Sequence, residues 1–315
     1  MHVLIISNHG GRFSSQRTIA LVRPGAIGDV LMSLNCIPAL RKAYPHHKIL
    51  YYCSEFIGRE LKPLMSVAGI DEVLVYDRDA LDVHLCDKVV NLIGYPLSEG
   101  YPNVPMKRHL IDYFADEIGV PALEHFKFKP EPFPGVAPLS YVTIHPTPGW
   151  SSYKGWGKSK WEQIIALYPD LKFIQIGAEQ DPQLVGADTS YLGLPIMVSV
   201  SLIGNALFHI GIDSFSNHVT HITDTPAIIL WGSTQASASG YEENLNLSLD
   251  LPCQSACFRE DPAMSIHPKG PCINPPGQDY THPQHACMSG ITVNMVNDAI
   301  KALLPSVLAH RGKLL

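Results

Sequence analysis

The first half of the chain alternates short apolar runs with amphipathic segments. Residues 29–43 place Val30, Leu34, Ile37 and Leu40 on one stripe, which predicts a helix with one face in a core. The apolar runs are rich in β-branched residues and are continuous, which is typical of a parallel sheet covered on both faces. Strands are expected at residues 18–23, 48–53, 72–77 and 88–93, and helices at 29–43, 57–67 and 107–118.

A proline- and glycine-rich segment, residues 124–140, interrupts this alternation and predicts an interdomain linker. Beyond it the alternation restarts, so two consecutive doubly wound units predict an α/β protein with two Rossmann-like domains facing a cleft. Strands are expected at residues 141–144, 172–177, 196–198, 208–211 and 227–230, and helices at 158–168, 200–206 and 292–304. We expect domains at residues 1–135 and 136–250, a finger at 251–290 and a closing helix at 291–315, with residues 1–17 as an extension without assigned chemistry.

Composition narrows the class of protein. The chain has 315 residues, which is too many for one ordinary core and suits two domains. Its 46% hydrophobic and 17% charged content is typical of a globular protein, and its net charge of −6 disfavours a general nucleic-acid surface. Residues 1–6 are apolar but too short, and without a basic flank, for a signal peptide, and no apolar run is long enough to span a membrane. We therefore expect a cytoplasmic protein.

The stretch Arg23-Pro24-Gly25-Ala26-Ile27-Gly28-Asp29 follows the first expected strand. A buried strand that feeds a glycine turn and a helix start puts a carboxylate and free backbone N–H groups at the carboxyl end of a parallel sheet, where open α/β folds bind ligands. Alternatively, Asp29 is only an N-cap. A nicotinamide-binding fingerprint fits poorly, because Pro24 stands where its first glycine is needed and only Gly25 and Gly28 remain.

Polar residues also follow the expected strands of the second half. Thr147 and Lys154 follow the strand at 141–144, although Lys158 and Lys160 are close enough to leave the choice of lysine open, and a lysine-rich loop is often only solvated. Glu179 follows the strand at 172–177 and is either a ligand or a helix-start residue. The segment Asp213-Ser214-Phe215-Ser216-Asn217-His218 follows the strand at 208–211, and its helix-start amides would suit a phosphate group. The alternative for that segment is an ordinary capped helix with a core histidine. Gly232 follows the strand at 227–230.

Together these motifs resemble the ADP-heptose:lipopolysaccharide heptosyltransferase family over about residues 18–300. The Gly-Asp-Val-Leu turn at Asp29, the Lys-x-Trp pattern at Lys154, the Gly-x-Glu turn at Glu179 and the Asp-Ser-x-x-x-His segment carry the resemblance. Phe215 replaces the usual glycine of that last motif, which puts the usual close approach of the backbone in doubt.

The resemblance implies a GT-B glycosyltransferase. Asp29 would be the catalytic base, and Lys154 would contact the donor phosphates and stabilise the negative charge that builds on the departing diphosphate. The nucleotide-sugar site would comprise Gly28, Thr147, Glu179, Asp213, Ser214, Phe215, Ser216, His218 and Gly232. No organic cofactor is expected.

Seven cysteines are an odd number for a disulfide framework. Cys36, Cys53 and Cys86 lie in apolar segments and are interpreted as core residues. The other four, Cys253, Cys257, Cys272 and Cys287, lie in a segment dense in Pro, Gly and His that lacks the apolar residues to fold by burial. Four thiolates predict one structural metal ion, iron or zinc, with unligated thiols as the alternative.

This cysteine arrangement resembles the C-terminal iron-binding finger of bacterial autotransporter heptosyltransferases. That branch uses ADP-heptose to modify serine hydroxyls on proteins and forms large ring-like assemblies, which implies a homo-oligomer here. However, only 17 residues precede the first expected strand, whereas that branch carries a substantial extra N-terminal region.

We therefore expect an inverting glycosyltransferase that moves a sugar, best interpreted as heptose from ADP-heptose, to an acceptor hydroxyl on a protein or a sugar. Two alternatives remain open. One is a sugar-nucleotide epimerase, which also uses paired Rossmann-like domains, and the other is a non-catalytic assembly protein built around the metal finger.

Overall fold

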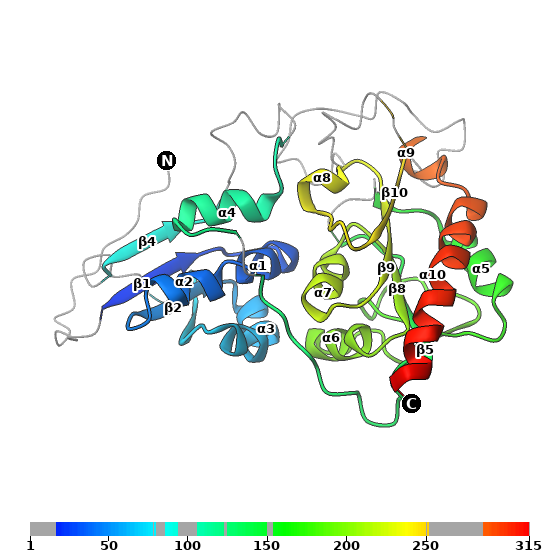
Figure 1. Ribbon diagram of the computed structural model, residues 1–315, viewed down its shortest axis with the longest axis horizontal. Helices are drawn as coiled ribbons and strands as arrows, with labels where there is room; N and C mark the ends of the chain where they lie inside the picture. Colours follow the sequence, from blue (N-terminus) through cyan, green and yellow to red (C-terminus); the bar gives the residue numbers. More distant parts are fainter. Residues whose placement is uncertain are drawn as a thin grey trace. The chain divides into compact units, whose positions relative to one another are not determined.

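The computed structural model describes residues 17–77, 79, 86–93, 106–122, 125–149, 154–249, 251 and 286–314, without the side chains of residues 310–314. The chain forms two compact units (Figure 1). Unit 1 comprises Met1–Pro96 and Leu110–Phe128, and unit 2 comprises Leu97–His109 and Lys129–Leu315. Over the described residues, every helix is too short or too polar to cross a membrane.

Unit 1 is built on a parallel four-stranded sheet in the order β3-β2-β1-β4. The strands are β1 (Thr18–Val22), β2 (Lys48–Cys53), β3 (Glu72–Val75) and β4 (Lys88–Asn91), and the helices are α1 (Ile27–Leu34), α2 (Ile37–Ala43), α3 (Glu55–Ala68) and α4 (Leu110–Ile118). Every residue of the central strand β1 is buried, as its continuous apolar run predicts. The chain leaves β1 towards β2 on one side, while β4 lies on the other side, so a topological switch point lies between β1 and β4.

The single helix expected at residues 29–43 is two helices. Helix α1 begins at Ile27 and α2 begins at Ile37, and Asn35 and Cys36 separate them. Pro38 explains the break, because a proline cannot donate the helical hydrogen bond to the residue four positions earlier and its ring would clash with that carbonyl. Cys36 is fully buried at the break, so the apolar stripe that suggested one helix still faces the core.

Unit 2 is built on a parallel six-stranded sheet in the order β10-β9-β8-β5-β6-β7. The strands are β5 (Tyr141–His145), β6 (Lys172–Gln175), β7 (Ala187–Asp188), β8 (Phe208–Ile212), β9 (Ala227–Trp231) and β10 (Leu245–Ser248). The helices are α5 (Lys158–Leu167), α6 (Ile196–Gly204), α7 (Phe215–Thr223), α8 (Ala236–Ser239), α9 (Ala286–Ser289) and α10 (Val293–Leu314). Its switch point lies between β5 and β8, where the chain turns from one half of the sheet to the other.

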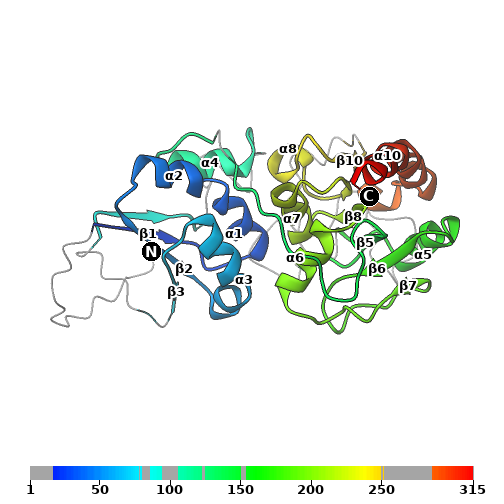
Figure 2. The same cartoon turned by 60° about the horizontal axis from the view of Figure 1, so that its bottom comes forward.

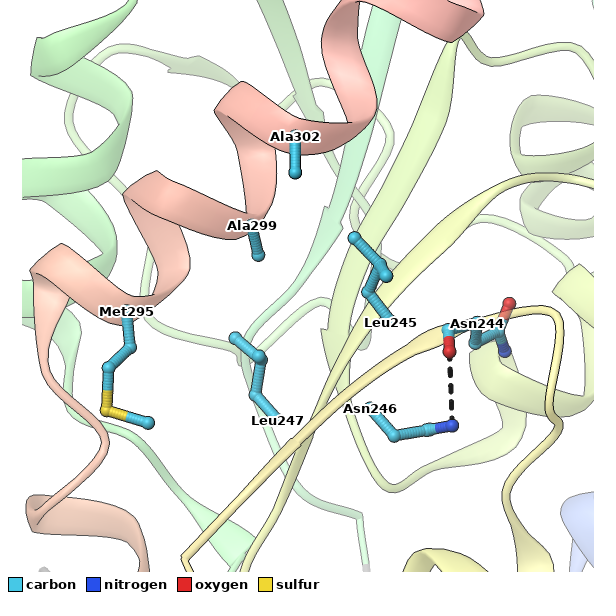
Figure 3. A pocket seen from close by; sticks show the side chains of 7 residues that line it. All are labelled: Asn244, Leu245, Asn246, Leu247, Met295, Ala299 and Ala302. Atoms are coloured by element: carbon cyan, nitrogen blue, oxygen red, sulfur yellow. Dashed lines mark hydrogen bonds between the residues drawn. The ribbon is translucent and has the colours of Figure 1, made fainter.

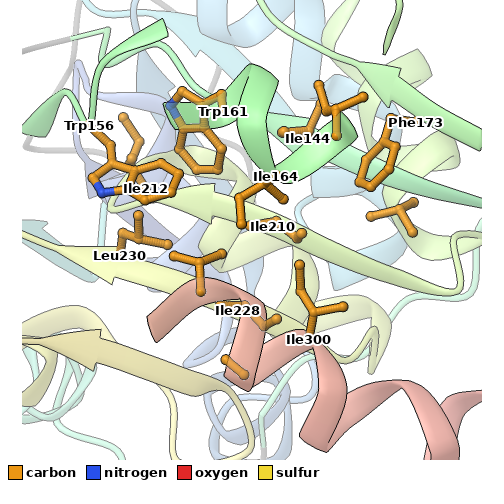
Figure 4. Packing of buried hydrophobic residues seen from close by; sticks show 14 of the residues in the cluster. Ile144, Trp156, Trp161, Ile164, Phe173, Ile210, Ile212, Ile228, Leu230 and Ile300 are labelled. Atoms are coloured by element: carbon orange, nitrogen blue, oxygen red, sulfur yellow. The ribbon is translucent and has the colours of Figure 1, made fainter. Parts of the chain in front are cut away.

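Helices cover both faces of this sheet. Helices α6 and α7 lie on one face, and α5 and α10 lie side by side on the other (Figure 2). On the latter face Ile210, Ile212, Ile228 and Leu230 of β8 and β9 pack against Trp161 of α5 and Ile300 of α10 (Figure 4). Burial of each of these aliphatic side chains stabilises the folded state by roughly 1.5–3 kcal/mol, compared with the same side chain exposed to water. The opposite face of β5 and β8 carries buried polar residues instead, and it leads to the candidate site.

The prediction of a strand at Ile196–Val198 is wrong, since these residues form the first turn of α6. A short continuous apolar run does not distinguish a buried strand from a buried helix. Here the run continues through Leu202 and Ile203, both buried, so the helix that was expected to begin at residue 200 includes the whole of it.

Candidate active site

In unit 1, Asp29 lies at the carboxyl end of β1, as the third residue of α1 and directly after Gly28. The N-cap of α1 is Ala26, so Asp29 is not the N-cap itself. Its Oδ2 atom accepts a hydrogen bond from the backbone N–H of Ala26 at 3.0 Å. This bond caps the helix from inside its first turn, where a negative charge is favoured by the helix dipole.

Arg23 holds the same oxygen from the other side. Its Nη2 pairs with Asp29 Oδ2, and its Nη1 donates to the carbonyl of Leu92 at 2.7 Å. Because Arg23 follows β1 and Leu92 follows β4, this guanidinium joins the two loops that diverge at the switch point. Among the described residues, no side chain or backbone group bonds to Oδ1 of Asp29, so this oxygen is available to a ligand.

In unit 2, Lys154 and Asp213 form a partly buried ion pair at the switch point, with Nζ 2.6 Å from Oδ2. The hydroxyl of Thr234, beyond β9, donates to the same carboxylate oxygen. Burial alone would raise the pKa of Asp213, but the charge of Lys154 and the hydrogen bonds from Lys154 and Thr234 outweigh it and hold the pKa below its ordinary value. The pair therefore fixes a cation at the carboxyl ends of β5 and β8.

Lys158 and Lys160 lie elsewhere. Lys158 is exposed and faces Glu162 one helical turn away at 3.6 Å. Lys160 donates to the carbonyls of Ser289 and Ile291, at 2.7 and 3.1 Å, and burial lowers its pKa. Trp156 is fully buried and also donates to Ile291, at 2.7 Å, so it belongs to the core rather than to an exposed phosphate loop.

Helix α7 begins at the same switch point. Ser214 is its N-cap, with an extended backbone and no capping bond from its side chain, and Phe215 is its first residue. Phe215 has helical backbone geometry, so this position does not need glycine. The buried Ser216 hydroxyl lies 3.1 Å from Nδ1 of His145, and the Phe215 ring packs edge-on against the His145 ring. The Asn217 amide donates to the Ser214 carbonyl at 3.1 Å, whereas the amides of Phe215 and Ser216 have no such partner among the described residues, which is the arrangement that suits an anion.

His218, one turn into α7, is buried, and its Nδ1 lies 2.8 Å from the hydroxyl of Tyr241. Burial lowers the pKa of His218 to about 3, so the ring is neutral at physiological pH. Gly232 directly follows β9, in the loop that carries Thr234.

Thr147 and Glu179 occupy the loops after β5 and β6. Thr147 lies beside Asp181, which accepts a hydrogen bond from the backbone N–H of Ala178 at 2.9 Å. Burial raises the pKa of Asp181, and the Ala178 N–H and the nearby Thr147 oppose that shift. Gly177 has a φ of +150°, and a Cβ there would collide with the Asp181 carboxylate, so the turn requires glycine.

Sequence reasoning did not assign Arg23, Asp181 or Tyr241 to the site, and it placed Thr234 only in the Gly-x-Thr turn after the strand at 227–230 that resembles the heptosyltransferases. Asp181 carried a local signal, because it lies four residues after Gly177 in the turn that follows β6, and aspartate is common in turns. The partners of Arg23 and Tyr241 lie on other elements, and the bond from Thr234 to Asp213 joins residues 21 positions apart, so no local pattern reveals these contacts.

Of the predicted metal ligands, only Cys287 lies within the described residues, where it is buried in α9, and Cys253, Cys257 and Cys272 lie outside them. The part of the chain that the structure describes contains no group of three His, Cys, Asp or Glu side chains that could hold a metal ion. Burial raises the pKa of Cys36 to about 12 and that of Cys53 to about 11, which fits unreactive core thiols.

A separate pocket lies between β10 and α10 (Figure 3). Its lining residues are Asn244, Leu245, Asn246, Leu247, Met295, Ala299 and Ala302. It shares no residue with the switch-point loops, and none of its lining side chains carries a charge for a phosphate group. It is therefore distinct from the candidate site.

Solved heptosyltransferases have the same fold as this chain. The iron-containing, dodecameric heptosyltransferase TibC of enterotoxigenic E. coli, solved in complex with ADP-D-β-D-heptose, is 17% identical over 94% of this chain and 78% of its own, with a TM-score of 0.72. The E. coli ADP-heptose LPS heptosyltransferase II is 14% identical over 93% of this chain and 99% of its own, with a TM-score of 0.65. A family 9 glycosyl transferase from Veillonella parvula is 16% identical over 92% and 97%, with a TM-score of 0.63.

No family model and no curated protein sequence matches the chain. The structural matches extend over nearly the whole chain and confirm the prediction of a GT-B fold built from two Rossmann-like domains. They also confirm, at the level of the fold, the resemblance to heptosyltransferases. The predicted metal finger lies largely outside the described residues.

Proposed function

We propose that this protein is an inverting glycosyltransferase that transfers a sugar, heptose from ADP-heptose in the best-supported case, to an acceptor hydroxyl. The observation that carries the proposal is the Lys154–Asp213 pair beside the start of α7 at the switch point of unit 2. It occurs in a chain that has the fold of TibC, whose structure holds ADP-D-β-D-heptose.

Unit 2 is assigned the donor. When the bond between the sugar and the diphosphate breaks, negative charge builds on the leaving diphosphate. The ammonium of Lys154 and the amides of Phe215 and Ser216 at the start of α7 supply fixed positive charge and hydrogen-bond donors for that group. Asp213 positions Lys154, and Thr234 orients Asp213. Glu179 is assigned to the nucleoside, and the Thr147–Asp181 contact shapes the adjoining turn.

Unit 1 is assigned the acceptor. The acceptor oxygen attacks the anomeric carbon as the bond from that carbon to the phosphate oxygen breaks, and its proton passes to Oδ1 of Asp29. A single displacement of this kind inverts the anomeric carbon. Oδ2 is already held by Arg23 and by the Ala26 N–H, so the carboxylate keeps its orientation while Oδ1 takes the proton.

We also propose one structural metal ion at Cys253, Cys257, Cys272 and Cys287. Four thiolates suit iron or zinc, and TibC is an iron-containing protein. The ion would stabilise residues 251–290, which contain few apolar residues, and it would take no part in the transfer. Cys287 lies in α9, which packs on the core of unit 2, so the ligand set would attach the finger to that core. A finger of this kind is also a subunit contact for a homo-oligomer.

The variant Asp29→Asn tests the transfer. Asparagine keeps the size of the side chain and still accepts from the Ala26 N–H, but it cannot take a proton. We expect kcat to fall about a hundredfold or more with ADP-heptose and the protein's acceptor, while ADP binding measured by calorimetry is unchanged. Turnover equal to that of the unsubstituted protein would refute Asp29 as the base.

Product analysis by mass spectrometry, with a panel of nucleotide-sugars and lysate as the source of acceptor, identifies donor and acceptor. A mass increase of one heptose on a protein supports a protein hydroxyl as the acceptor. Conversion of the nucleotide-sugar to an isomer in the absence of lysate would support an epimerase instead and overturn the proposal.

A further inference from the structure

Tyr241 lies at the centre of a cluster of aromatic and imidazole rings in unit 2. The His221 ring stacks on it, with 3.9 Å between centroids and 5° between planes, and His221 is bonded to Glu243. The rings of His218 and His109 also contact Tyr241, at 5.7 and 5.3 Å. Tyr241 itself is buried, at 5% exposure, so its hydroxyl must find its partner inside the protein.

That partner is Nδ1 of His218, 2.8 Å away, and among the described residues the Tyr241 hydroxyl bonds to no other group. If Nδ1 carried the hydrogen and donated it to the phenol oxygen, the phenol hydrogen would be buried without an acceptor. The reverse direction, from O–H to a bare Nδ1, satisfies both groups. A neutral imidazole with a bare Nδ1 carries its hydrogen on Nε2.

Both groups are in the protonation states that this direction needs. Burial lowers the pKa of His218 to about 3, and burial raises the pKa of Tyr241 well above its ordinary value. The imidazole is therefore neutral and the phenol keeps its proton over the whole physiological range.

His218 is well placed to use its Nε2 hydrogen. It lies one turn into α7, whose N-terminus is the proposed diphosphate site, and it interacts electrostatically with Asp213 and Lys154. In the described part of the chain no group bonds to Nε2 of His218. A neutral N–H adds a hydrogen bond for a phosphate oxygen without placing a second cation beside Lys154.

We propose that Tyr241 is a positioning residue that holds His218 as its Nε2–H tautomer, so that Nε2 donates to the diphosphate of the nucleotide-sugar. The choice of ligand rests on the proposed function, whereas the tautomer does not. His221, stacked on the Tyr241 ring and bonded to Glu243, fixes the ring that carries the hydroxyl.

The test compares Tyr241→Phe with Tyr141→Phe. Tyr241→Phe keeps the ring that stacks on His221 and removes only the hydroxyl. Tyr141 is equally buried in unit 2, and its hydroxyl donates to the Leu202 carbonyl at 2.8 Å, so Tyr141→Phe removes a comparable hydrogen bond away from the site. The tautomer of His218 is read from long-range 1H–15N spectra of the full chain labelled at histidine, with and without ADP.

In the unsubstituted protein and in Tyr141→Phe, we expect a protonated Nε2 and a bare Nδ1 at His218, and a shift of the Nε2 signal on addition of ADP. In Tyr241→Phe we expect a mixture of tautomers and about a tenfold lower kcat/KM for the donor. A protonated Nδ1 in the unsubstituted protein, or an unchanged tautomer in Tyr241→Phe, overturns the inference whatever happens to activity. The expected tautomers with no response of Nε2 to ADP would instead overturn the diphosphate as the ligand of His218, and ADP binding measured by calorimetry on the same protein tells this failure apart from a failure of the proposed function.

Discussion

Arg23 is the residue that gives the candidate base a fixed orientation. Its side chain is mostly buried, lies over the ring of Phe114 and connects Asp29 to the Leu92 carbonyl. A planar guanidinium can satisfy both acceptors at once, whereas the single ammonium of lysine matches this geometry poorly. Orientation of the carboxylate therefore depends on the shape of Arg23 as well as on its charge.

We accordingly expect Arg23→Gln to lower kcat about ten- to a hundredfold, because a misplaced base loses the near-attack geometry. The KM for the donor should not change, since the donor is assigned to unit 2. Arg23→Lys should recover activity only in part. Steady-state kinetics with both substrates check these values.

Arg41→Gln is the matched control for this experiment. Arg41 also joins loops of unit 1, through bonds to the carbonyls of His47 and Gly69 and an ion pair with Asp71, but it has no contact with Asp29. The Arg41→Gln protein should be less stable than the unsubstituted protein but should keep its kcat per folded molecule. An equal loss of kcat in both variants would show that Arg23 acts through the fold alone.

The buried histidines make a second prediction at the residue scale. Burial lowers the pKa of His145 to about 4 and that of His209 to about 3, from 6.5 in an unfolded chain. Between about pH 6.5 and 4 the unfolded state therefore binds more protons than the folded state, so the free energy of unfolding falls as the pH falls. Each such histidine contributes up to about 1.4 kcal/mol per pH unit in that window.

His209→Asn should reduce this slope by about one histidine's share, as measured by urea unfolding at several pH values between 7 and 5. Thr143→Val is the control, because it removes the hydroxyl 3.0 Å from Nδ1 of His209 but leaves the imidazole in place. Thr143→Val should lower the free energy of unfolding at every pH but keep its slope against pH. A slope that does not change in His209→Asn would mean that His209 is protonated in the folded protein.

Several candidate site residues were predictable from the sequence because they follow strand ends. Asp29, Lys154 and Asp213 all lie at the switch points of their sheets, as the strand-then-polar pattern indicates. The contacts that select among candidates were not predictable. Lys160, for example, bonds to carbonyls about 130 positions away, and nothing near it in the sequence indicates this.

At the scale of elements, the longer patterns placed strands and helices in the right parts of the chain, although Pro38 divides the helix expected at 29–43 into α1 and α2. Strand β2 has its predicted bounds, whereas the run at 196–198 belongs to α6. Strand β10 was not expected, because Leu245-Asn246-Leu247-Ser248 has only two apolar positions. The segment is a strand because it pairs with β9. Pairing with a neighbouring strand, which local sequence does not encode, decides such cases.

The segment from Lys154 to Lys160 leads into α5 and gives a prediction at the scale of elements. Lys160→Met removes the lysine donor from the Ser289 carbonyl and leaves the Ile291 carbonyl with Trp156 alone, so we expect a loss of about 1–3 kcal/mol of stability and normal kinetics per folded molecule. Lys154→Met should lower kcat/KM for the donor about a hundredfold or more, because it removes the charge assigned to the diphosphate. Thermal unfolding and initial rates on the same preparations check both.

Lys158→Met is the matched control in this segment, since Lys158 is exposed and its contact with Glu162 contributes little. It should change neither stability nor rate. If Lys160→Met rather than Lys154→Met abolished donor turnover at normal stability, the assignment of the phosphate lysine would be wrong.

At the scale of the whole molecule, the sequence predicted two Rossmann-like halves because the strand–helix alternation stops in a proline-rich segment and then restarts. The two sheets and their parallel pairing agree with that prediction. Composition also set apart residues 251–290, where cysteine, proline and histidine replace the apolar periodicity of the rest of the chain. A segment of this kind cannot offset its ordering entropy by burial, which is why a metal ion is the expected source of its stability.

The last prediction concerns that segment. Elemental analysis of protein purified without chelators should find one iron or zinc ion per chain, and Cys253→Ser should remove it, because a serine hydroxyl is a poor ligand for a metal that prefers thiolates. The variant should also unfold at a lower temperature and form smaller oligomers, while the rate per folded molecule changes little. Cys53→Ser is the control, because Cys53 is a buried thiol of unit 1. This variant should be less stable but should still contain the metal ion. Unsubstituted protein without a stoichiometric metal ion, or equal metal content in the two variants, would refute the proposed site.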